Sequence, residues 1–405
     1  MRLPNALGAL REPNVARYLA ATAVSTLGSG IAMVALAFAV LDVGGATDLG
    51  IVLLAREIPI VVFLLLGGVF ADRLSRRAIL VGSDLVKGAA QAATAALFFT
   101  GTADVWKVAL LQMVFGVAVS FSRPASFGII KQAASNERLQ QANALLQLAR
   151  SSLSIAGPAI GALIVAAGSP ALALAIDAST FVASALLIAS MRLALAVRPP
   201  AASILADLRE GWHEFIDRTW VVAMVASFGL FQLTYFPALL VLGPLVAKQD
   251  LGGVGAWGLI LAIGSAGAVA GGVLALHLTA HRPLVATTLL AIPAGMFLAT
   301  LSIPLLLALI CLMSFAAGVG FSIGETLWFT TLQRNVPEHV LSRISSFDWL
   351  GSVALNPIGY LVVGPLSGAI GTSETLALAA VLNVGVSLSL LLVPSVRGLK
   401  TAPVS

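Results

Sequence analysis

Charged residues are scarce in this chain. Aspartate, glutamate, lysine and arginine together make up 10% of its 405 residues, whereas a soluble domain carries about 25%. A water-soluble protein with so few charges would expose large apolar patches and aggregate. Hydrophobic residues make up 59% of the chain, and its mean hydropathy is +1.00. Lipid is the solvent that suits such a surface, so the composition predicts a membrane protein.

Cysteine, histidine and the motifs of common enzymes are rare or missing as well. The single cysteine, Cys311, lies in a hydrophobic run, where we expect it to serve as an apolar packing residue. The four histidines are too scattered to form a metal site. The sequence holds no G-x-x-x-x-G-K-[ST] phosphate-binding loop and no spacing that predicts a nucleophile beside a base. It therefore predicts no enzyme, no metal and no cofactor.

Long apolar runs, such as 305–323 and 376–393, predict membrane-spanning helices. A helix needs about 20 apolar residues to cross the hydrocarbon layer, and a transmembrane barrel would show short alternating segments instead. An all-α membrane protein with twelve transmembrane helices is therefore expected. The predicted spans are 15–41, 49–71, 78–100, 105–127, 140–167, 171–192, 220–246, 254–277, 284–301, 304–330, 342–368 and 374–394.

The positive charges predict how the chain crosses the membrane. Most of the 23 Lys and Arg residues lie on the side of the two termini, and Lys- and Arg-rich loops stay in the cytoplasm. Lys107 and Lys248 fall at the opposite side, where acidic residues such as Asp104 and Glu374 gather. We expect a multi-pass protein of the cytoplasmic (inner) membrane with both termini cytoplasmic. The net charge of +5, placed in short loops, does not indicate nucleic-acid binding.

The connection 193–219 is the only long one between predicted spans. Apolar residues recur in it at helical spacing from Ile204 to Ile216, opposite a charged face. This pattern predicts an amphipathic helix on the inner membrane surface. We expect it to act as a cytoplasmic linker between an N-terminal six-helix bundle at 1–192 and a C-terminal one at 220–405.

The two predicted bundles repeat each other. Phe121 at the end of span four recurs as Phe321 at the end of span ten, and Gly68 recurs as Gly272 with nearly the same spacing. Because each half has six spans, the repeats run parallel. Such repeats are typical of secondary transporters that rock about a central site.

The loop after span two relates the chain to a known family. It contains Gly68, Asp72, Arg73, Arg76 and Arg77 at the spacing G-x-x-x-D-R-x-x-R-R. This resembles the G-x-x-x-D-R-x-G-R-R signature of the major facilitator superfamily, with a serine in place of the second glycine. The glycine lets two helices approach closely, and the aspartate can accept N–H groups of a helix N-terminus. The resemblance implies a latch that holds the halves in one state.

Span five contains a second motif of that superfamily. Gly157, Pro158 and Gly161 resemble the G-P-x-x-G element of its antiporters, in which proline and glycine bend the helix and let it pack tightly. The family's span-four R-x-x-Q-G motif is absent, and Gln112 stands at its arginine position. The chain otherwise looks like the twelve-span drug:proton antiporter branch, which includes macrolide-efflux and enterobactin-export proteins. That likeness extends through the runs 67–77, 138–143, 207–215 and 342–351.

Ionisable residues inside the predicted spans mark candidate sites. Each costs about 2.5–3.5 kcal/mol or more in lipid, so a function is the default hypothesis. Glu57 is the first candidate for a proton-carrying carboxylate, with Glu325 and Asp348 behind it, because burial disfavours the charged form of a carboxyl group. Asp177, near the outer end of span six, is expected to lie at a wet helix end.

Further charges are expected to act in gating. Asp84, near the inner end of span three, is a predicted partner of the latch. Arg123 and Glu325 occupy equivalent places in the two repeats, and we expect them to pair near the inner mouth of a central cavity. Arg150 in span five is a predicted member of the same network.

Aromatic residues predict an apolar substrate cavity. Phe231 and Tyr235 cluster with Gln232 in span seven, Trp328 lies in span ten, and Gln112 is a polar candidate in span four. Such a lining suits bulky amphiphilic or cationic compounds.

The sequence thus predicts a monomeric secondary active transporter in the lipid bilayer. We expect it to export hydrophobic or amphiphilic, drug-like small molecules by alternating access in exchange for protons. Three alternatives stay open. They are a dedicated siderophore or metabolite exporter, an importer or uniporter, and a non-transporting membrane sensor.

Overall fold

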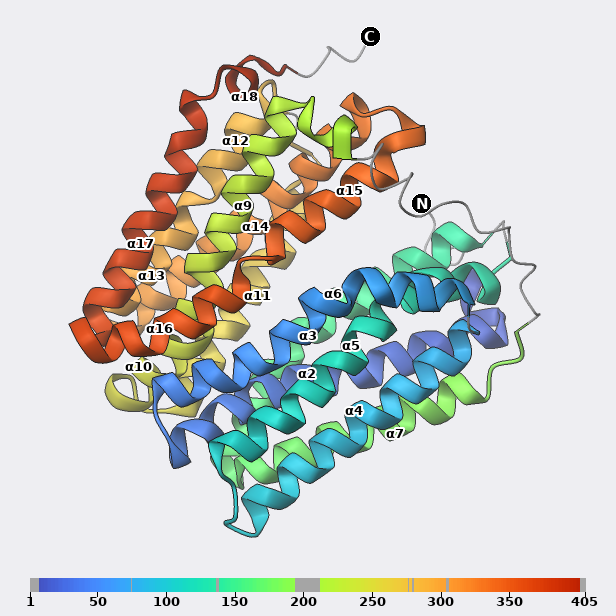
Figure 1. The fold of residues 1–405 in the computed structure, drawn as a ribbon, viewed down its shortest axis with the longest axis vertical. Coiled ribbons are helices and arrows are strands. Elements are labelled where there is room, and N and C mark those ends of the chain that lie inside the picture. The colour runs from blue at the N-terminus through green and yellow to red at the C-terminus, as the bar shows by residue number, and fades with distance from the viewer. Residues whose placement is uncertain are drawn as a thin grey trace. The chain divides into compact units, whose positions relative to one another are not determined.

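The computed structural model describes residues 7–73, 75–135, 138–193, 212–275, 277–278, 280–303 and 306–400. Within these residues every regular element is a helix. The chain divides into two compact units, Met1–Pro199 and Pro200–Ser405, each of which Figure 1 shows as a bundle of long helices.

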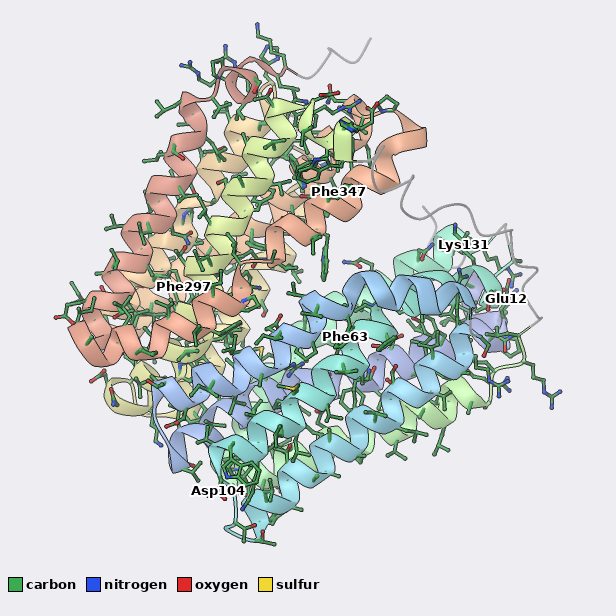
Figure 2. All side chains as sticks on the ribbon, in the orientation of Figure 1. Glu12, Phe63, Asp104, Lys131, Phe297 and Phe347 are labelled. Atoms are coloured by element: carbon green, nitrogen blue, oxygen red, sulfur yellow. The ribbon has the colours of Figure 1, made fainter. Side chains whose placement is uncertain are left out.

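The first unit contains one helix for each of the first six predicted spans. A short 3-10 helix, η1 (Leu7–Arg11), precedes them. The helices α5 and α6 meet at a short connection on the same end as η1, and Figure 2 shows Glu12 and Lys131 at that end and Asp104 at the other. The six helices are α2 (Pro13–Val43), α3 (Ala46–Arg73), α4 (Arg76–Phe99), α5 (Val105–Ala133), α6 (Leu139–Ala167) and α7 (Pro170–Ala189).

The second unit also contains six spans, but three of them are interrupted. Span seven comprises α9 (Thr219–Pro237), the π-helical η2 (Ala238–Leu242) and α10 (Gly243–Asp250). Span nine comprises α12 (Pro283–Leu290) and α13 (Ile292–Ser302), and span eleven comprises α15 (Glu338–Val353) and α16 (Asn356–Ile370). The remaining elements are α11 (Val254–Ala275), α14 (Leu307–Asn335), α17 (Thr372–Ser389), η3 (Leu390–Leu392) and α18 (Pro394–Gly398).

The predicted fold, an all-α membrane protein with twelve spans, is confirmed. Ten stretches of the described residues are long and apolar enough to cross a membrane by length and composition alone. The other two spans are α3 and α4, which carry several ionisable residues. Helix ends agree with the predicted spans within a few residues, except that α5 and α14 continue further past their predicted ends.

Glycine contacts show that the two units use the same packing. A Cβ on Gly161 of α6 would collide with the Ile31 carbonyl oxygen of α2. In the second unit, a Cβ on Gly359 of α16 would collide in the same way with the Leu233 carbonyl oxygen of α9. Small residues let membrane helices approach closely. Span five therefore packs on span one as span eleven packs on span seven, which supports the predicted repeat.

The predicted linker lies largely outside the described residues, which omit 194–211. Residues 212–216 are helical, and the Phe215 side chain is buried. The ring of Trp212 lies 5.8 Å from that of Phe215 and 5.5 Å from that of Phe347 in α15. The end of the linker is therefore anchored on the second unit by aromatic contacts.

Candidate substrate pocket

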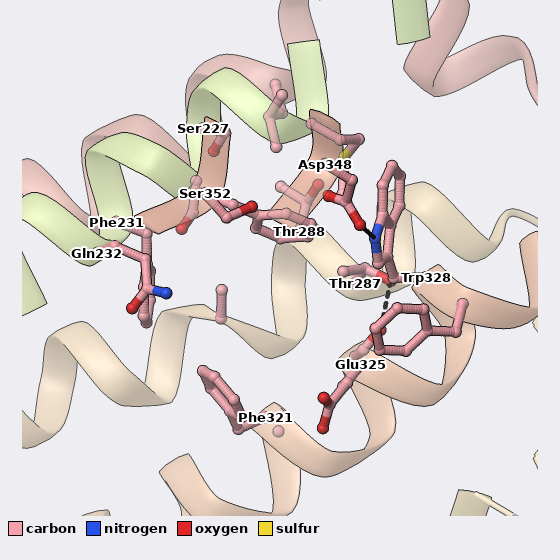
Figure 3. A pocket seen from close by; sticks show the side chains of 18 of the residues that line it. Ser227, Phe231, Gln232, Thr287, Thr288, Phe321, Glu325, Trp328, Asp348 and Ser352 are labelled. Atoms are coloured by element: carbon pink, nitrogen blue, oxygen red, sulfur yellow. Dashed lines mark hydrogen bonds between the residues drawn. The ribbon is translucent and has the colours of Figure 1, made fainter. Parts of the chain in front are cut away.

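A pocket of about 320 Å³ opens within the second unit. This volume lies at the lower end of the range of small-molecule sites. The helices α9, α12, α14, α15 and α17 contribute to it (Figure 3). The lining residues are Met224, Ser227, Phe228, Phe231, Gln232, Thr287, Thr288, Ala291, Gly320, Phe321, Gly324, Glu325, Trp328, Phe329, Asp348, Trp349, Ser352, Val353, Ser387 and Leu390.

Two of the helix interruptions border this pocket. Ala291 lies between α12 and α13, and Val353 is the last residue of α15. In a bilayer, irregular backbone is tolerated where it is buried in protein or lines a cavity. The irregular backbone of spans nine and eleven therefore lies beside a cavity, where a bilayer protein tolerates it.

Aromatic rings form much of the pocket wall. The ring of Phe228 lies 5.3 Å from that of Trp328 in an edge-on contact. The ring of Phe231 lies 6.2 Å from that of Phe321, which is about half exposed. Rings of this kind offer flat apolar surfaces and attract cations to their faces.

Two carboxylates share the pocket. Asp348 is buried, and its Oδ2 accepts a hydrogen bond of 3.0 Å from the indole Nε1 of Trp328 (Figure 3). Glu325 is exposed and lies one turn before Phe329 on α14. Among the described residues that line the pocket, none is a lysine, arginine or histidine. The pocket is thus acidic and aromatic.

The structure brings five predicted residues together here and places a sixth beside them. Phe231, Gln232 and Trp328, predicted for the substrate cavity, lie with Glu325 and Asp348, predicted for proton coupling. In Figure 3, Phe231 and Gln232 face Asp348 and Trp328 across the pocket. Tyr235 lies outside the lining, with its ring stacked 4.9 Å from that of Phe231. The sequence missed the small polar lining residues, which resemble ordinary helix-packing residues.

Gln112 does not line this pocket. Its side chain is fully buried in the first unit, and its Nε2 donates a hydrogen bond of 3.3 Å to the Oε1 of Gln91 on α4. Helix α4 covers Gln112 in the structure described, and its role in a substrate cavity stays a prediction.

The prediction of a wet helix end at Asp177 is wrong. The side chain is fully buried. Its Oδ2 accepts a hydrogen bond of 2.9 Å from the Nε2 of Gln91. Distance from the end of α7 does not expose Asp177, because the faces of α2 and α4 close over it.

The predicted latch is described only in part. Helix α3 continues through Arg73, but the side chains of 64–74, which include Gly68 and Asp72, lie outside the described residues. Arg77 donates a hydrogen bond to the Ala189 carbonyl oxygen at the end of α7. The latch function of Asp72, Arg73, Arg76 and Arg77 stays a prediction.

Asp84 points into the contact between α4 and α7. Its Oδ1 lies 2.6 Å from the Nζ of Lys87, and its Oδ2 accepts a hydrogen bond of 2.6 Å from Ser184. These partners belong to α4 and α7 and not to the arginine cluster. Asp84 as a latch partner stays a prediction.

The other predicted charges lie in the first unit. Glu57 on α3 is half-buried, and its charge acts on Arg123 of α5. Arg150 is half-buried on α6. Arg123 and Glu325 belong to different units, and their pairing stays a prediction.

The glycines of the predicted antiporter element lie in a close contact between α6 and α2. A Cβ on Gly30 would lie only 2.8 Å from the Cα of Gly157 and 3.0 Å from the Cδ of Pro158. Helix α6 continues through Pro158. The tight packing expected of this element is present.

Twelve spans in two similar units, with an acidic and aromatic pocket among the helices of one unit, are typical of a membrane transporter. The model of the Major Facilitator Superfamily matches residues 18–354, and the chain belongs to that family. The resemblance found in the motifs is confirmed.

Relatives of this chain are drug-efflux proteins. The multidrug efflux pump Tap of Mycobacterium tuberculosis is 27% identical over 401 residues, which cover 95% of this chain and 94% of Tap. Macrolide efflux protein A of Streptococcus pyogenes is 24% identical over 396 residues, which cover 94% of this chain and 96% of that protein.

Solved structures show the same fold. A point mutant of the nucleoside transporter NupG has a TM-score of 0.77 at 11% identity, covering 94% of this chain and 99% of that chain. A bacterial homologue of the lysosomal transporter Spinster has a TM-score of 0.72 at 14% identity, covering 97% of this chain and 99% of the homologue.

Proposed function

We propose that this transporter exports positively charged, amphiphilic small molecules across the cytoplasmic membrane in exchange for protons. The observation that carries the proposal is the pocket in the second unit. It combines aromatic walls with two carboxylates, and none of its described lining residues is basic. The drug-efflux relatives support the direction and the kind of substrate.

The pocket chemistry suits a cation better than an anion or a neutral molecule. The rings of Phe231, Phe321 and Trp328 would contact the apolar part of the substrate. The carboxylates of Glu325 and Asp348 would offset its charge, and a charge pair is stronger in an apolar site than in water. Such a pocket disfavours an anion, because two like charges would face it.

Proton exchange would use the same carboxylates. An ionised carboxylate binds the cation, and a protonated one no longer attracts it. Glu325 is the more exposed of the two, so it is the first candidate to change its charge during release. Glu57 on α3 remains a predicted carrier in the other unit. The protein would act as a monomer, with both termini in the cytoplasm, by alternating access between its two units.

Everted membrane vesicles test this function. With a preset pH gradient, addition of a lipophilic cation such as tetraphenylphosphonium should be followed by its uptake and by loss of the gradient. A neutral amphiphile of similar size should cause neither. Equal transport of both compounds would contradict the charge selectivity, and cation uptake without loss of the gradient would contradict proton exchange.

Two variants connect that assay with the pocket. Glu325→Gln and Asp348→Asn should each reduce cation uptake by at least about tenfold, which corresponds to about 1.4 kcal/mol. Asp217→Asn is the matched control, because Asp217 is an exposed carboxylate outside the lining. If all three variants behave alike, the pocket carboxylates do not bind the substrate.

A further inference from the structure

A seam of polar side chains runs along the contact between α4 and α7 in the first unit. The participating positions are spaced by three or four residues on each helix, so each set occupies one helical face. The two helices are antiparallel, so residue numbers rise along α4 while those of their partners fall along α7. Along the seam, Asp84 meets Ser184 at 2.6 Å, the Nζ of Lys87 lies 4.6 Å from the ring centroid of Phe181, and Gln91 meets Asp177 at 2.9 Å.

Asp177 is the most enclosed member of the seam. Its hydrogen-bond partners in the described structure are the side chains of Gln91 and Thr180, which are both uncharged. A Cβ on Gly28 of α2 would lie 2.6 Å from the Oδ1 of Asp177. The backbone of α2 therefore packs directly against the carboxyl group. A carboxyl group enclosed in a membrane helix bundle is costly and is typical of proton relays.

A chain of amides leads away from Asp177. Gln91 donates to Asp177, and Gln112 donates to the Oε1 of Gln91. The Oε1 of Gln112 is buried and accepts no hydrogen bond from the described residues. The chain therefore ends in an acceptor that lacks a donor, although buried polar atoms are nearly always paired.

Protonation of Asp177 would supply that donor. The protonated carboxyl can donate to the Oε1 of Gln91 once this amide rotates, because each amide carries a carbonyl oxygen and two N–H groups. If the amide of Gln112 rotates as well, the Nε2 of Gln91 can donate to the Oε1 of Gln112. The amide chain thus has one arrangement for the ionised carboxylate and another for the neutral carboxyl.

The charged groups around Asp177 come from two neighbouring helices. Lys87 on α4 and Arg56 on α3 act on it electrostatically. Lys87 is paired with Asp84, and the guanidinium of Arg56 lies 4.4 Å from the ring centroid of Phe115. The titratable groups of α2, which are Arg17, Tyr18 and Asp42, lie far along the helix from Gly28, the α2 residue that meets Asp177. The titratable groups of α5 are Lys107, Arg123 and Lys131, and α6 contributes Arg150.

We propose that Asp177 is a proton-binding site in the first unit, whose ionised and neutral forms are accommodated by rotation of the Gln91 and Gln112 amides. The proposal rests on the proposed proton exchange and adds a site outside the substrate pocket. A proton bound at Asp177 would therefore act on the transport cycle without occupying the place of the substrate. It would also alter the balance of charge around Lys87 and Arg56.

Infrared difference spectra of the purified full-length protein in lipid test the site directly. Lowering the pH from about 9 to about 5 leaves exposed carboxyls ionised, so new carboxyl C=O absorption reports enclosed groups. Asp177→Asn should remove one component of this absorption, and the exposed-site control Asp217→Asn should keep it. If both variants keep the full signal, Asp177 binds no proton and the proposal is overturned.

A second variant keeps the test valid if Asp177→Asn does not fold. Gln91→Leu leaves the carboxyl in place but removes the N–H that stabilises its ionised form. The same infrared component should then appear at a higher pH than in the wild type. An unchanged titration in Gln91→Leu would overturn the proposal.

Transport measurements separate this site from the proposed function. In proteoliposomes, Asp177→Asn should reduce proton release caused by the substrate while binding of tetraphenylphosphonium is retained, whereas Glu325→Gln should lose the binding. Proton release that is unchanged in Asp177→Asn would overturn the role in transport. If the wild type itself moves the cation without proton release, proton exchange fails, and the infrared component still decides whether Asp177 binds a proton.

Discussion

The two carboxylates of the pocket are held differently. Asp348 is buried and accepts the indole N–H of Trp328, which fixes its orientation. Glu325 is exposed on the preceding helix, α14. In the proposed function, the fixed Asp348 would position the cation and the exposed Glu325 would exchange its proton with water.

Replacing Trp328 by phenylalanine should weaken cation binding. The change keeps an aromatic ring but removes the donor to Asp348. A hydrogen bond to a charged group contributes about 1.5–3 kcal/mol, so the Kd for tetraphenylphosphonium should rise by about tenfold or more. Equilibrium binding to the purified protein measures this.

Trp220→Phe is the control for that variant. Trp220 packs edge-on against Trp328 at 5.8 Å but lies outside the pocket lining. Its replacement should leave the Kd almost unchanged. Equal losses in Trp220→Phe and Trp328→Phe would show that ring packing matters and the hydrogen bond to Asp348 does not.

Glu12, just before α2, should make the stability of the folded protein depend on pH only in the acidic range. Hydrogen bonds from the side chain and the backbone of Ser135 hold the pKa of the Glu12 carboxyl below its ordinary value of 4.5. A carboxyl group with a lowered pKa stabilises the folded protein at every pH above its ordinary pKa. This contribution is lost as the pH falls through the folded-state pKa. The contact is partly solvated, so it should contribute no more than about 1 kcal/mol.

Thermal unfolding of Glu12→Gln in detergent checks this expectation. The variant should be slightly less stable than the wild type at neutral pH, and the difference should disappear well below pH 4.5. A difference that grows as pH falls would contradict the contact between Glu12 and Ser135.

At the scale of helices, single glycines decide which elements pack most closely. Gly161→Leu should force α6 away from the Ile31 carbonyl of α2. Overpacking of this kind costs about 1–3 kcal/mol, so the variant should unfold at a lower temperature. Gly82→Leu on α4 is the control, because a Cβ there meets nothing within 4 Å. Equal destabilisation by both changes would show that helix contact is not the cause.

Helix interruptions distinguish the second unit from the first. Pro237 has no N–H to donate, and the backbone continues from it as the π-helical η2. Ala291 and Val353 mark further interruptions at the pocket. Pro237 is a visible signal in the sequence for the first of these. The interruption after Val353 has no comparable signal before it.

At the scale of the whole molecule, the orientation in the membrane can be tested on one helix. Asp104 and Lys131 are exposed at opposite ends of α5 (Figure 2). The one native cysteine, Cys311, is buried, so an added cysteine can be labelled selectively. On intact cells, a membrane-impermeant thiol reagent should label Asp104→Cys and leave Lys131→Cys unlabelled.

Permeabilised cells provide the control for this experiment, because both variants should then be labelled. Labelling of Lys131→Cys alone on intact cells would reverse the predicted orientation. The wild type should stay unlabelled in both preparations, since its cysteine is enclosed.

The sequence by itself determined the number of spans, their approximate ends and the family. These are local properties, because a membrane helix satisfies its backbone internally and its length follows from the thickness of the lipid. The sequence also selected Glu325, Asp348 and Trp328 as members of a site, since charges and large rings inside spans are conspicuous. It did not show that Trp328 holds Asp348.

Only the tertiary structure decided the surroundings of Asp177 and Gln112. From the sequence, one was expected at a wet helix end and the other at a substrate cavity. Both are enclosed in the first unit and connected through Gln91. The physical reason is that helical periodicity indicates which residues share a face, whereas the neighbour that covers the face depends on how six helices pack together.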